Sequence, residues 1–260
     1  IHEETALTPE ARRAIATHTF EVLEPNQSKL IAPLSTVNQQ LTSGVDVLSS
    51  PSISVYAGAA PGLWRFDPSE DPGGTMATLI TDTGSSVVRD VFLHDASEIA
   101  YVALSTGFHT CVYEPGEGID EDEPCQSHSG GALPSDDITA IMRLEVEASD
   151  RLLVGTTKGL YIAGNVSDPV AGGSVRLDNK RIGAFARDAE RLWIATSAGL
   201  FRYDIGGASP FGAEPMHQPV PSEGAGDNLT DLALGSGGTL WVSSNNGISR
   251  LSPGSPGVWT

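Results

Sequence analysis

The hydrophobic and polar positions of this chain alternate in short runs that form a repeated block. In "RLWIATSAGLFRYD" (residues 191–204) an apolar run leads into a small polar turn, and a glycine opens a second apolar run. The block recurs without gaps as "SVYAGAAPGLWRFD", "IAYVALSTGFHTCV", "RLLVGTTKGLYIAG" and "TLWVSSNNGISRLS". Its ninth position is always glycine: Gly62, Gly107, Gly159, Gly199 and Gly247. Because glycine supplies the backbone angles of a tight turn, each block predicts a β-hairpin.

The spacing of these hairpins indicates the fold. Successive turn glycines are 40 to 52 residues apart, and a short apolar segment precedes each hairpin while a weaker one follows it. Four strands in about 45 residues is the period of a β-propeller blade. No long amphipathic helical pattern is present, which excludes helical solenoids. We therefore predict an all-β chain that forms a single β-propeller of four-stranded antiparallel blades.

The blocks also predict the domain organisation. The repeats span about residues 44–81, 90–129, 137–177, 181–218 and 228–260 of a propeller at 19–260. Residues 19–43 form either a degenerate blade or a segment that closes the ring, so we expect six blades, with five as the alternative. Residues 1–18 form an N-terminal arm whose short helix begins near Thr8 and Pro9. The chain begins with Ile1, so either a leader has been removed or the sequence starts within a longer protein.

The third position of each block is large and apolar. It is occupied by Tyr56, Tyr101, Leu153, Trp193 and Trp241. This position lies on the second strand of each predicted blade, which faces the neighbouring blades. We expect these side chains to pack one blade on the next rather than to bind a ligand.

The two best-preserved blocks, at residues 192–204 and 240–252, resemble the two-component regulator propeller repeat. The resemblance extends over all five blocks. It implies a β-propeller of the kind found in the extracellular sensor parts of bacterial hybrid histidine kinases and in many secreted or lipid-anchored proteins. Those sensors carry two propellers and a further sandwich before a membrane span. This chain is much shorter, so we expect a stand-alone or excised propeller.

The charge balance narrows the possible partners. The chain contains 33 acidic and 15 basic residues, with a net charge of −18. A field of this sign repels nucleic acid and anionic lipid, so neither is an expected partner. No apolar run approaches the length of a membrane span.

The two cysteines lie on predicted neighbouring strands of one blade. Cys111 falls on the third strand and Cys125 on the fourth, with a long acidic loop between them. We predict a disulfide, which indicates an exported protein in the periplasm, on the cell surface or secreted. Two unpaired thiols in a cytosolic protein are the alternative.

Candidate binding residues lie in the loops at one end of the predicted blades, where propellers usually bind their ligands. The turns between second and third strands (B–C turns) and the connections between blades (D–A connections) carry hydroxyl, amide and charged groups there. The candidates are Asp90, Asp137, Thr157, Lys158, Arg181, Thr196, Ser197, Asp227, Asn228 and Asn245. The same residue types are also what turns prefer, so each one has an alternative explanation as turn chemistry.

Evidence for metal or enzyme chemistry is weaker. The acidic loop offers Asp120, Asp122 and Glu123 as a possible Ca²⁺ site, with a solvated loop as the alternative, and no other cofactor is expected. His109 and His128 flank the predicted disulfide and could approach each other, but the six histidines show no metal-binding spacing. No nucleophile motif occurs.

These features lead to three functional hypotheses. The first is an exported bacterial propeller that binds a protein, peptide or glycan through its loop face without catalysis. The second is a Ca²⁺-dependent hydrolase or lyase such as a lactonase, for which the inner strands would supply Asp46, Asp90 and Asp231. The third is a subunit of a larger surface or sensor assembly.

Overall fold

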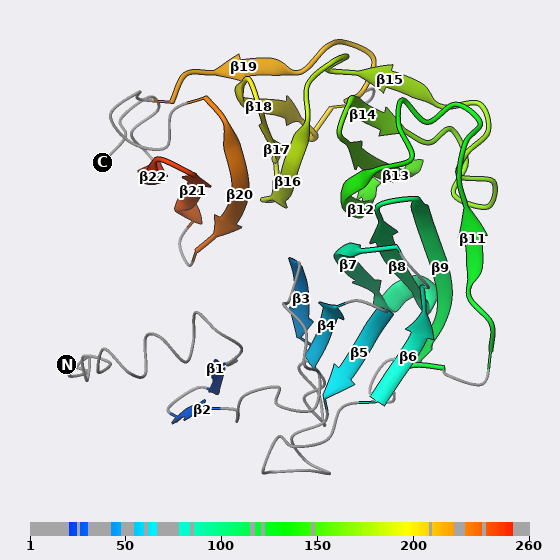
Figure 1. Cartoon of the computed structure of the whole chain (residues 1–260). Helices are drawn as coiled ribbons and strands as arrows, with labels where there is room; N and C mark the ends of the chain where they lie inside the picture. Colours follow the sequence, from blue (N-terminus) through cyan, green and yellow to red (C-terminus); the bar gives the residue numbers. More distant parts are fainter. Residues whose placement is uncertain are drawn as a thin grey trace. The chain divides into compact units, whose positions relative to one another are not determined.

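The structure is a computed structural model of the 260-residue chain. It describes residues 21–24, 27–30, 43–47, 55–59, 62–66, 78–83, 86–114, 118–120, 123–146, 149–207, 210–220, 227–235 and 238–251. Within these ranges the regular elements are β-strands and one 3-10 turn, η1 (Asp95–Ser97), which confirms the all-β prediction (Figure 1). The helix predicted near Thr8 lies outside the described residues. No helix that could span a membrane is found in the ranges above.

The chain divides into two compact units, and each is described by itself. The first comprises residues 1–100 and 111–125, and the second comprises residues 101–110 and 126–260. The first unit contains a two-stranded hairpin and a four-stranded antiparallel sheet. Their strands are β1 (Glu21–Glu24) and β2 (Gln27–Leu30), then β3 (Ser43–Val47), β4 (Val55–Ala59), β5 (Gly62–Phe66) and β6 (Thr78–Asp82).

The next sheet has a divided outer strand. Its strands are β7 (Val88–His94), β8 (Ile99–Leu104), β9 (Gly107–Glu114), β10 (Gly118–Ile119) and β11 (Gln126–His128). The sheet order is β10-β9-β8-β7, and β11 also pairs with β9. β10 pairs with residues 113–114 of β9, whereas β11 pairs with residues 108–110. The fourth-strand position is therefore occupied by two short strands, and the acidic loop connects them.

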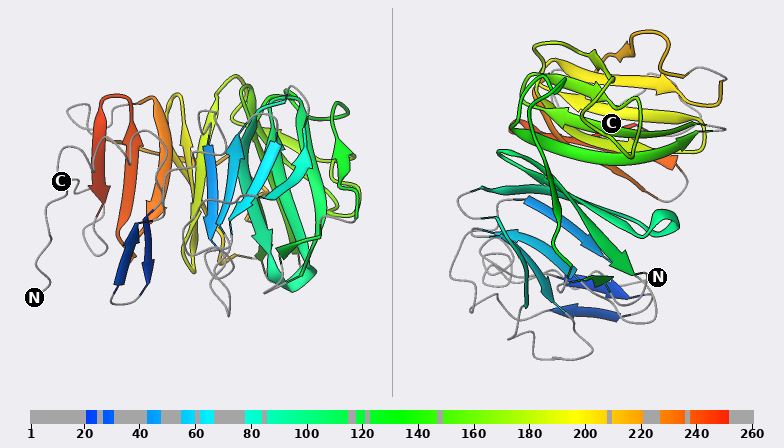
Figure 2. Two further views of the ribbon diagram at one scale, coloured as in Figure 1. Left: turned by 60° about the horizontal axis from the view of Figure 1, so that its bottom comes forward. Right: turned by 90° about the vertical axis from the view of Figure 1, so that its right-hand side faces the viewer.

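The second unit contains three further sheets in which each strand pairs with the next. The first holds β12 (Ile138–Val146), β13 (Ser149–Thr156), β14 (Gly159–Ile162) and β15 (Ser174–Arg176). The second holds β16 (Ile182–Arg187), β17 (Arg191–Thr196), β18 (Gly199–Asp204) and β19 (Met216–Gln218). The third holds β20 (Leu229–Leu234), β21 (Leu240–Ser244) and β22 (Gly247–Leu251). The first strands of consecutive sheets contact each other, β12 with β16 and β16 with β20 (Figure 2, left).

The apolar positions of the repeat form the core between these sheets. Leu153 belongs to a buried cluster that joins β12–β14 to β16–β18. Trp193 is 2% exposed and packs with residues of β20–β22, including Leu229 and Val242. Residues on both faces of β17 are buried, because a neighbouring sheet covers each face. Leu153 and Trp193 therefore have the packing role that the sequence predicts.

The third sheet of this unit differs from the other two. Its strand β21 alternates between buried Leu240 and Val242 and the more exposed Trp241. Trp241 is 42% exposed and lies under the guanidinium of Arg250, 5.7 Å from the ring centroid. Trp241 and Trp193 thus occupy the same position of the repeat but differ in burial.

Adjacent sheets approach closely at their first strands. The pairing of β12, β16 and β20 with the second strand of each sheet is irregular after its first residue. A bulge there changes the direction of the next side chain. At this position in β12 the hydroxyl of Thr139 donates to the carbonyl of Ile182 in β16, at 2.6 Å. In β16 the position is Gly183, and a Cβ there would lie 2.7 Å from the carbonyl oxygen of Leu229 in β20. The glycine allows the two backbones to come together.

Candidate functional site

The candidate loop face in the second unit is built from B–C turns and the connections beside them. In the first sheet of this unit, the N–H of Thr157 donates to the carbonyl of Asp137 at 3.0 Å. The equivalent bond in the next sheet runs from the N–H of Ser197 to the carbonyl of Arg181, at 2.9 Å. Each turn is therefore attached to the residue that leads into the first strand of its own sheet.

A second backbone bond attaches each turn to the connection that leaves the sheet. The N–H of Asn179 donates to the carbonyl of Lys158 at 2.9 Å, and the N–H of Gly199 donates to the carbonyl of Asp227 at 2.6 Å. A turn held from both sides loses little conformational freedom when a ligand binds, and this lowers the cost of binding. We call this end of the sheets, which carries Asp137, Thr157, Asp227, Asn228 and Asn245, the loop face.

The candidate residues on the loop face differ in exposure. Five have exposed side chains: Lys158, Ser197, Asp227, Asn228 and Asn245. Asp137, Thr157 and Arg181 are half-buried. The hydroxyl of Thr157 lies 3.0 Å from that of Ser135, and the Ser197 hydroxyl accepts the N–H of Arg181 at 3.1 Å. The exposed set combines one cation, one carboxylate, a hydroxyl and two amides.

Thr196 does not belong to the exposed surface, contrary to its prediction as a contact residue. It is fully buried, and its hydroxyl donates to the carbonyl of Gly199 at 2.8 Å while accepting the N–H of Ala198 at 3.0 Å. Thr156 makes the same two bonds in the preceding sheet. Gly199 has a φ of 104°, so the turn needs both the glycine and the threonine beneath it. The role of Thr196 is to support the turn.

The side chain of Asp90 makes a hydrogen bond within its own strand, a role that the sequence did not predict. It lies within β7, and its carboxylate accepts the N–H of Val91 at 2.9 Å. Asp231 in β20 accepts the N–H of Leu232 in the same way, at 2.8 Å. Each aspartate accepts a backbone N–H of its own first strand, so part of its carboxylate has a structural role.

The inner-strand aspartates Asp46 and Asp231 do not occupy the same register position in their sheets. Asp46 in β3 lies opposite Tyr56, whereas Asp231 in β20 lies opposite Ser243, two block positions closer to the turn. Across the described ranges, no three acidic, histidine or cysteine side chains gather as a metal would need. Of the predicted Ca²⁺ ligands, Asp122 lies outside these ranges, so that site stays a prediction.

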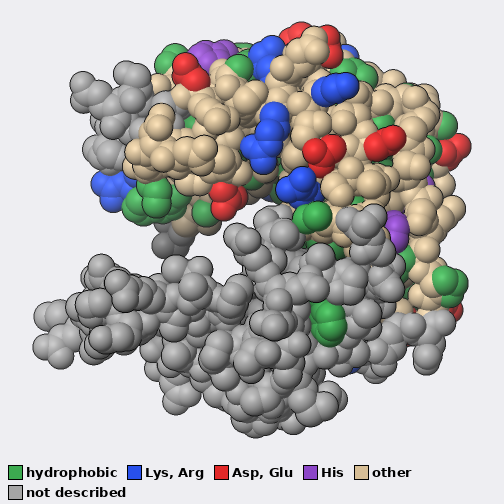
Figure 3. All heavy atoms as spheres, in the orientation of Figure 1, with side chains coloured by type: hydrophobic (Ala, Val, Ile, Leu, Met, Phe, Trp, Pro, Cys, Tyr) green, Lys and Arg blue, Asp and Glu red, His purple; other side chains and the backbone are tan. Residues whose placement is uncertain are grey.

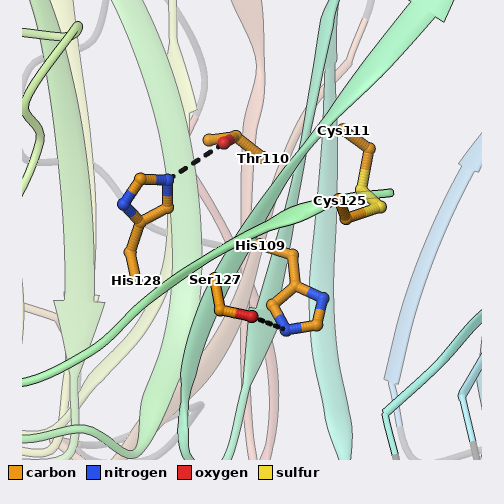
Figure 4. Close-up of a disulfide and its surroundings, with 6 residues drawn as sticks. All are labelled: His109, Thr110, Cys111, Cys125, Ser127 and His128. Carbon is orange, nitrogen blue, oxygen red and sulfur yellow. Dashed lines mark hydrogen bonds between the residues drawn. A yellow bond between two sulfur atoms is a disulfide. The ribbon is translucent and has the colours of Figure 1, made fainter. Parts of the chain in front are cut away.

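The predicted disulfide is present. Cys111 in β9 is bonded to Cys125, and their Cα atoms are 4.3 Å apart (Figure 4). The register of β9 with β11 places Gln126 opposite Thr110, so the two cysteines lie directly opposite each other at the next position. The bond therefore fixes the outer chain to β9 at the point where the acidic loop rejoins the sheet.

The two histidines beside the disulfide, which we call the histidine pair, do not approach each other. His109 lies opposite Ser127 and is hydrogen-bonded to its hydroxyl at 3.0 Å. His128 stacks on Phe108 and is hydrogen-bonded to the hydroxyl of Thr110 at 3.0 Å. Because side chains alternate along a strand, the two rings point to opposite faces of the sheet (Figure 4). Each is an ordinary hydrogen-bonded histidine.

Burial lowers the pKa of both histidines. Desolvation lowers the pKa of His109. It also lowers the pKa of His128, where the charge of His109 adds to the effect and that of Asp168 opposes it. Both rings are therefore neutral over a wider pH range than an exposed histidine.

The distribution of charge around the described residues is mixed. On the face drawn in Figure 3, Lys and Arg side chains are interspersed with Asp and Glu side chains instead of forming separate patches. Alternating charge of this kind suits a polar ligand better than a large ion of one sign.

A groove that the sequence analysis missed lies at the other end of the sheets in the second unit. It has a volume of about 470 Å³ between the sheet β12–β15 and the segment after β18. Its lining includes Arg151, Ser174 and Phe211. Several glycines also line it: Gly164, Gly172, Gly173 and Gly212. The glycine-rich loop after β14 was the only signal in the sequence, and glycines of this kind occur in many turns.

Comparisons with known proteins support the fold. No family model matches the chain, and no curated protein matches it closely enough to be counted as a relative. Two solved structures align with a TM-score of 0.57 each: the extracellular domain of a protein described as a hybrid two-component system from B. thetaiotaomicron, and PorZ, a surface component of the type-IX secretion system of Porphyromonas gingivalis. The alignments cover 84% and 90% of this chain at 14% and 13% identity.

The chain spans only about a third of the length of these two proteins, 33% and 36% respectively. At such low identity the likeness concerns the arrangement of the backbone. Together with the consecutive antiparallel sheets, three of which have four strands, it shows that the chain has a β-propeller fold.

Proposed function

We propose that this chain is a binding or assembly module that holds a polar ligand on its loop face. The observation that carries the proposal is the pattern of backbone hydrogen bonds from the turns to the connections on both sides of them. It holds the exposed Lys158, Ser197 and Asp227 on a pre-organised surface. Such a surface suits a peptide, a glycan or a loop of a protein, because each presents hydroxyl, amide and charged groups at short spacing.

We also propose that the protein works outside the cytoplasm. The disulfide between Cys111 and Cys125 supports this, because disulfides persist in oxidising compartments. Both structural neighbours are described as extracellular or surface components of bacterial systems. Fractionation of the source cells with a thiol-reactive tag tests this location. A cytoplasmic protein with two tagged cysteines would overturn it.

Two matched triple variants of the full chain test the loop face. Lys158→Ala, Asp227→Ala and Asn228→Ala remove a cation, a carboxylate and an amide whose side chains are exposed there. The control set removes a cation, a carboxylate and a hydroxyl exposed elsewhere in the second unit: Arg187→Ala, Glu190→Ala and Ser167→Ala. Both sets lower the number of charges equally, so net charge does not distinguish them.

The probes are a panel of bacterial surface polysaccharides and a library of displayed heptapeptides. We expect the native chain and the control variant to select the same probes, and the loop-face variant to lose them by at least tenfold in affinity, which is about 1.4 kcal/mol. Equal binding by both variants would place the binding surface elsewhere. A native chain that selects no probe at concentrations up to about 1 mM would contradict the proposed function.

A further inference from the structure

The groove at the end opposite the loop face has a defined position in the sheet. At the end away from the turn at residues 156–159, the pairing of β13 with β14 ends at Leu153 and Ile162; Arg151 lies two residues before Leu153, and Gly164 lies two residues after Ile162. Because the two strands are antiparallel, these residues lie side by side, and a guanidinium N–H of Arg151 donates to the carbonyl of Gly164 at 2.9 Å. This bond orients the guanidinium at the groove.

Arg151 differs from the other arginines of this region. Arg143 forms an ion pair with Asp150, and Arg176 forms one with Glu214 at 3.4 Å. Within the described ranges, the bond to a backbone carbonyl is the only polar contact of Arg151, and the groove lining contains no carboxylate. In a chain with 33 acidic and 15 basic residues, a cation at a groove without an acidic neighbour favours an external carboxylate.

The rest of the lining favours a peptide over a sugar. Pro210 and Phe211 form an apolar part of the wall, and the ring of Phe211 packs edge-on against Tyr203 with centroids 5.0 Å apart. Among the described residues that line the groove, only Ser174 and Arg151 have hydrogen-bonding side chains. A sugar needs several such groups for its hydroxyls, whereas a peptide end needs one carboxylate partner, an apolar surface and backbone to pair with.

Backbone is what the glycines supply. A Cβ at Gly164 would lie 2.5 Å from the carbonyl oxygen of Gly172, so glycine allows the two loops to meet at the floor of the groove. Gly172 itself has a φ of 68°, and its Cβ position has open space around it. At Gly172 the floor is thus backbone that a ligand can approach without meeting a side chain.

We propose that this groove binds the free C-terminus of an extended peptide, with the terminal carboxylate on Arg151 and Ser174 and an apolar last side chain against Phe211. The site is separate from the loop face and does not depend on its proposed function. A hydrogen bond from an arginine to a carboxylate is charge-assisted and stronger than a neutral hydrogen bond.

Calorimetry of the full chain tests the proposal with one probe pair. The probe is an acetylated tetrapeptide that ends in leucine with a free carboxylate, and its match is the same peptide with a C-terminal amide. We expect the amide to bind at least tenfold more weakly. Arg151→Gln should cause a similar loss, whereas Arg187→Gln, at an exposed arginine outside the groove, should cause none. Ser174→Ala should cause a smaller loss of affinity. It tests the same site independently of whether the Arg151→Gln variant folds.

Three outcomes would overturn the proposal. The first is equal binding of the acid and amide peptides. The second is an equal effect of the two arginine variants while circular dichroism shows both are folded. The third is binding of a galacturonic acid trimer but not of the peptide, which would make the ligand an acidic sugar. Loss of preference for leucine over alanine at the peptide end in Phe211→Ala would confirm the position of the last side chain.

Discussion

The repeat places two tryptophans at the same position in consecutive sheets, and the structure predicts that they differ in their contribution to stability. Trp193 is 2% exposed between two sheets, whereas Trp241 is 42% exposed. Each carries a cation over its ring, Arg191 at 5.9 Å and Arg250 at 5.7 Å from the centroid. Because the cation contacts match, the comparison of Trp193→Ala with Trp241→Ala isolates burial.

The expected magnitude follows from buried area. A fully buried tryptophan removes about 200 Å² from water, which at about 25 cal/mol per Å² amounts to about 5 kcal/mol, at the upper end of measured Trp→Ala losses. A little over half of the surface of Trp241 is buried, which gives about 3 kcal/mol by the same conversion. Trp193→Ala should therefore cost about 2 kcal/mol more than Trp241→Ala.

Urea unfolding followed by far-UV circular dichroism measures both losses without relying on tryptophan fluorescence. An unchanged dependence of the free energy of unfolding on urea concentration confirms that the variants unfold from the same compact state. Equal losses would refute the reasoning, because they would mean that the face of β21 that carries Trp241 is covered in solution. A loss below about 1 kcal/mol for Trp193→Ala would contradict the packing of β17 against β20–β22.

Three further outcomes follow from local geometry. Gly183→Ala should lower the free energy of unfolding in urea by about 1–3 kcal/mol, because its Cβ would meet the carbonyl of Leu229. Gly206→Ala, with open space around it, should change it by no more than about 0.5 kcal/mol. A neutral Gly183→Ala would contradict the close approach of β16 and β20. Replacing both Cys111 and Cys125 with alanine should lower the free energy of unfolding by about 3 kcal/mol. Reduction of the native chain with dithiothreitol should lower its midpoint of urea unfolding in the same way. An unchanged midpoint would argue against a structural role of the disulfide. For the histidine pair the pKa values are lowered in the folded state, so protonation favours the unfolded chain. The free energy of unfolding should therefore fall as the pH drops below about 6.5, the pKa of an unperturbed histidine. Replacing both rings with asparagine should flatten that slope between about pH 7.5 and pH 5, whereas an unchanged slope would assign it to other groups.

The sequence by itself determined the strands, the turns and their repetition. These depend on neighbours in the chain: the alternation of apolar residues specifies a strand, and a glycine with positive φ, such as Gly199, specifies where it turns back. The disulfide was predictable from the repeat, because the blade pattern assigns Cys111 to the third strand and Cys125 to the fourth, and these strands are neighbours. Within the loop face, the exposed turn residue Lys158 could be predicted in the same way.

Only the tertiary structure decided which residues are buried and which are exposed. Thr196 and Ser197 are adjacent in sequence and equally polar, but the threonine hydroxyl is buried under the turn while Ser197 is exposed. The groove at Arg151 is formed between one sheet and a segment that follows the next sheet, so no local pattern encodes it. Trp193 and Trp241 differ because burial depends on whether another sheet packs on that face, and the chemical identity of a residue carries no information about its distant neighbours.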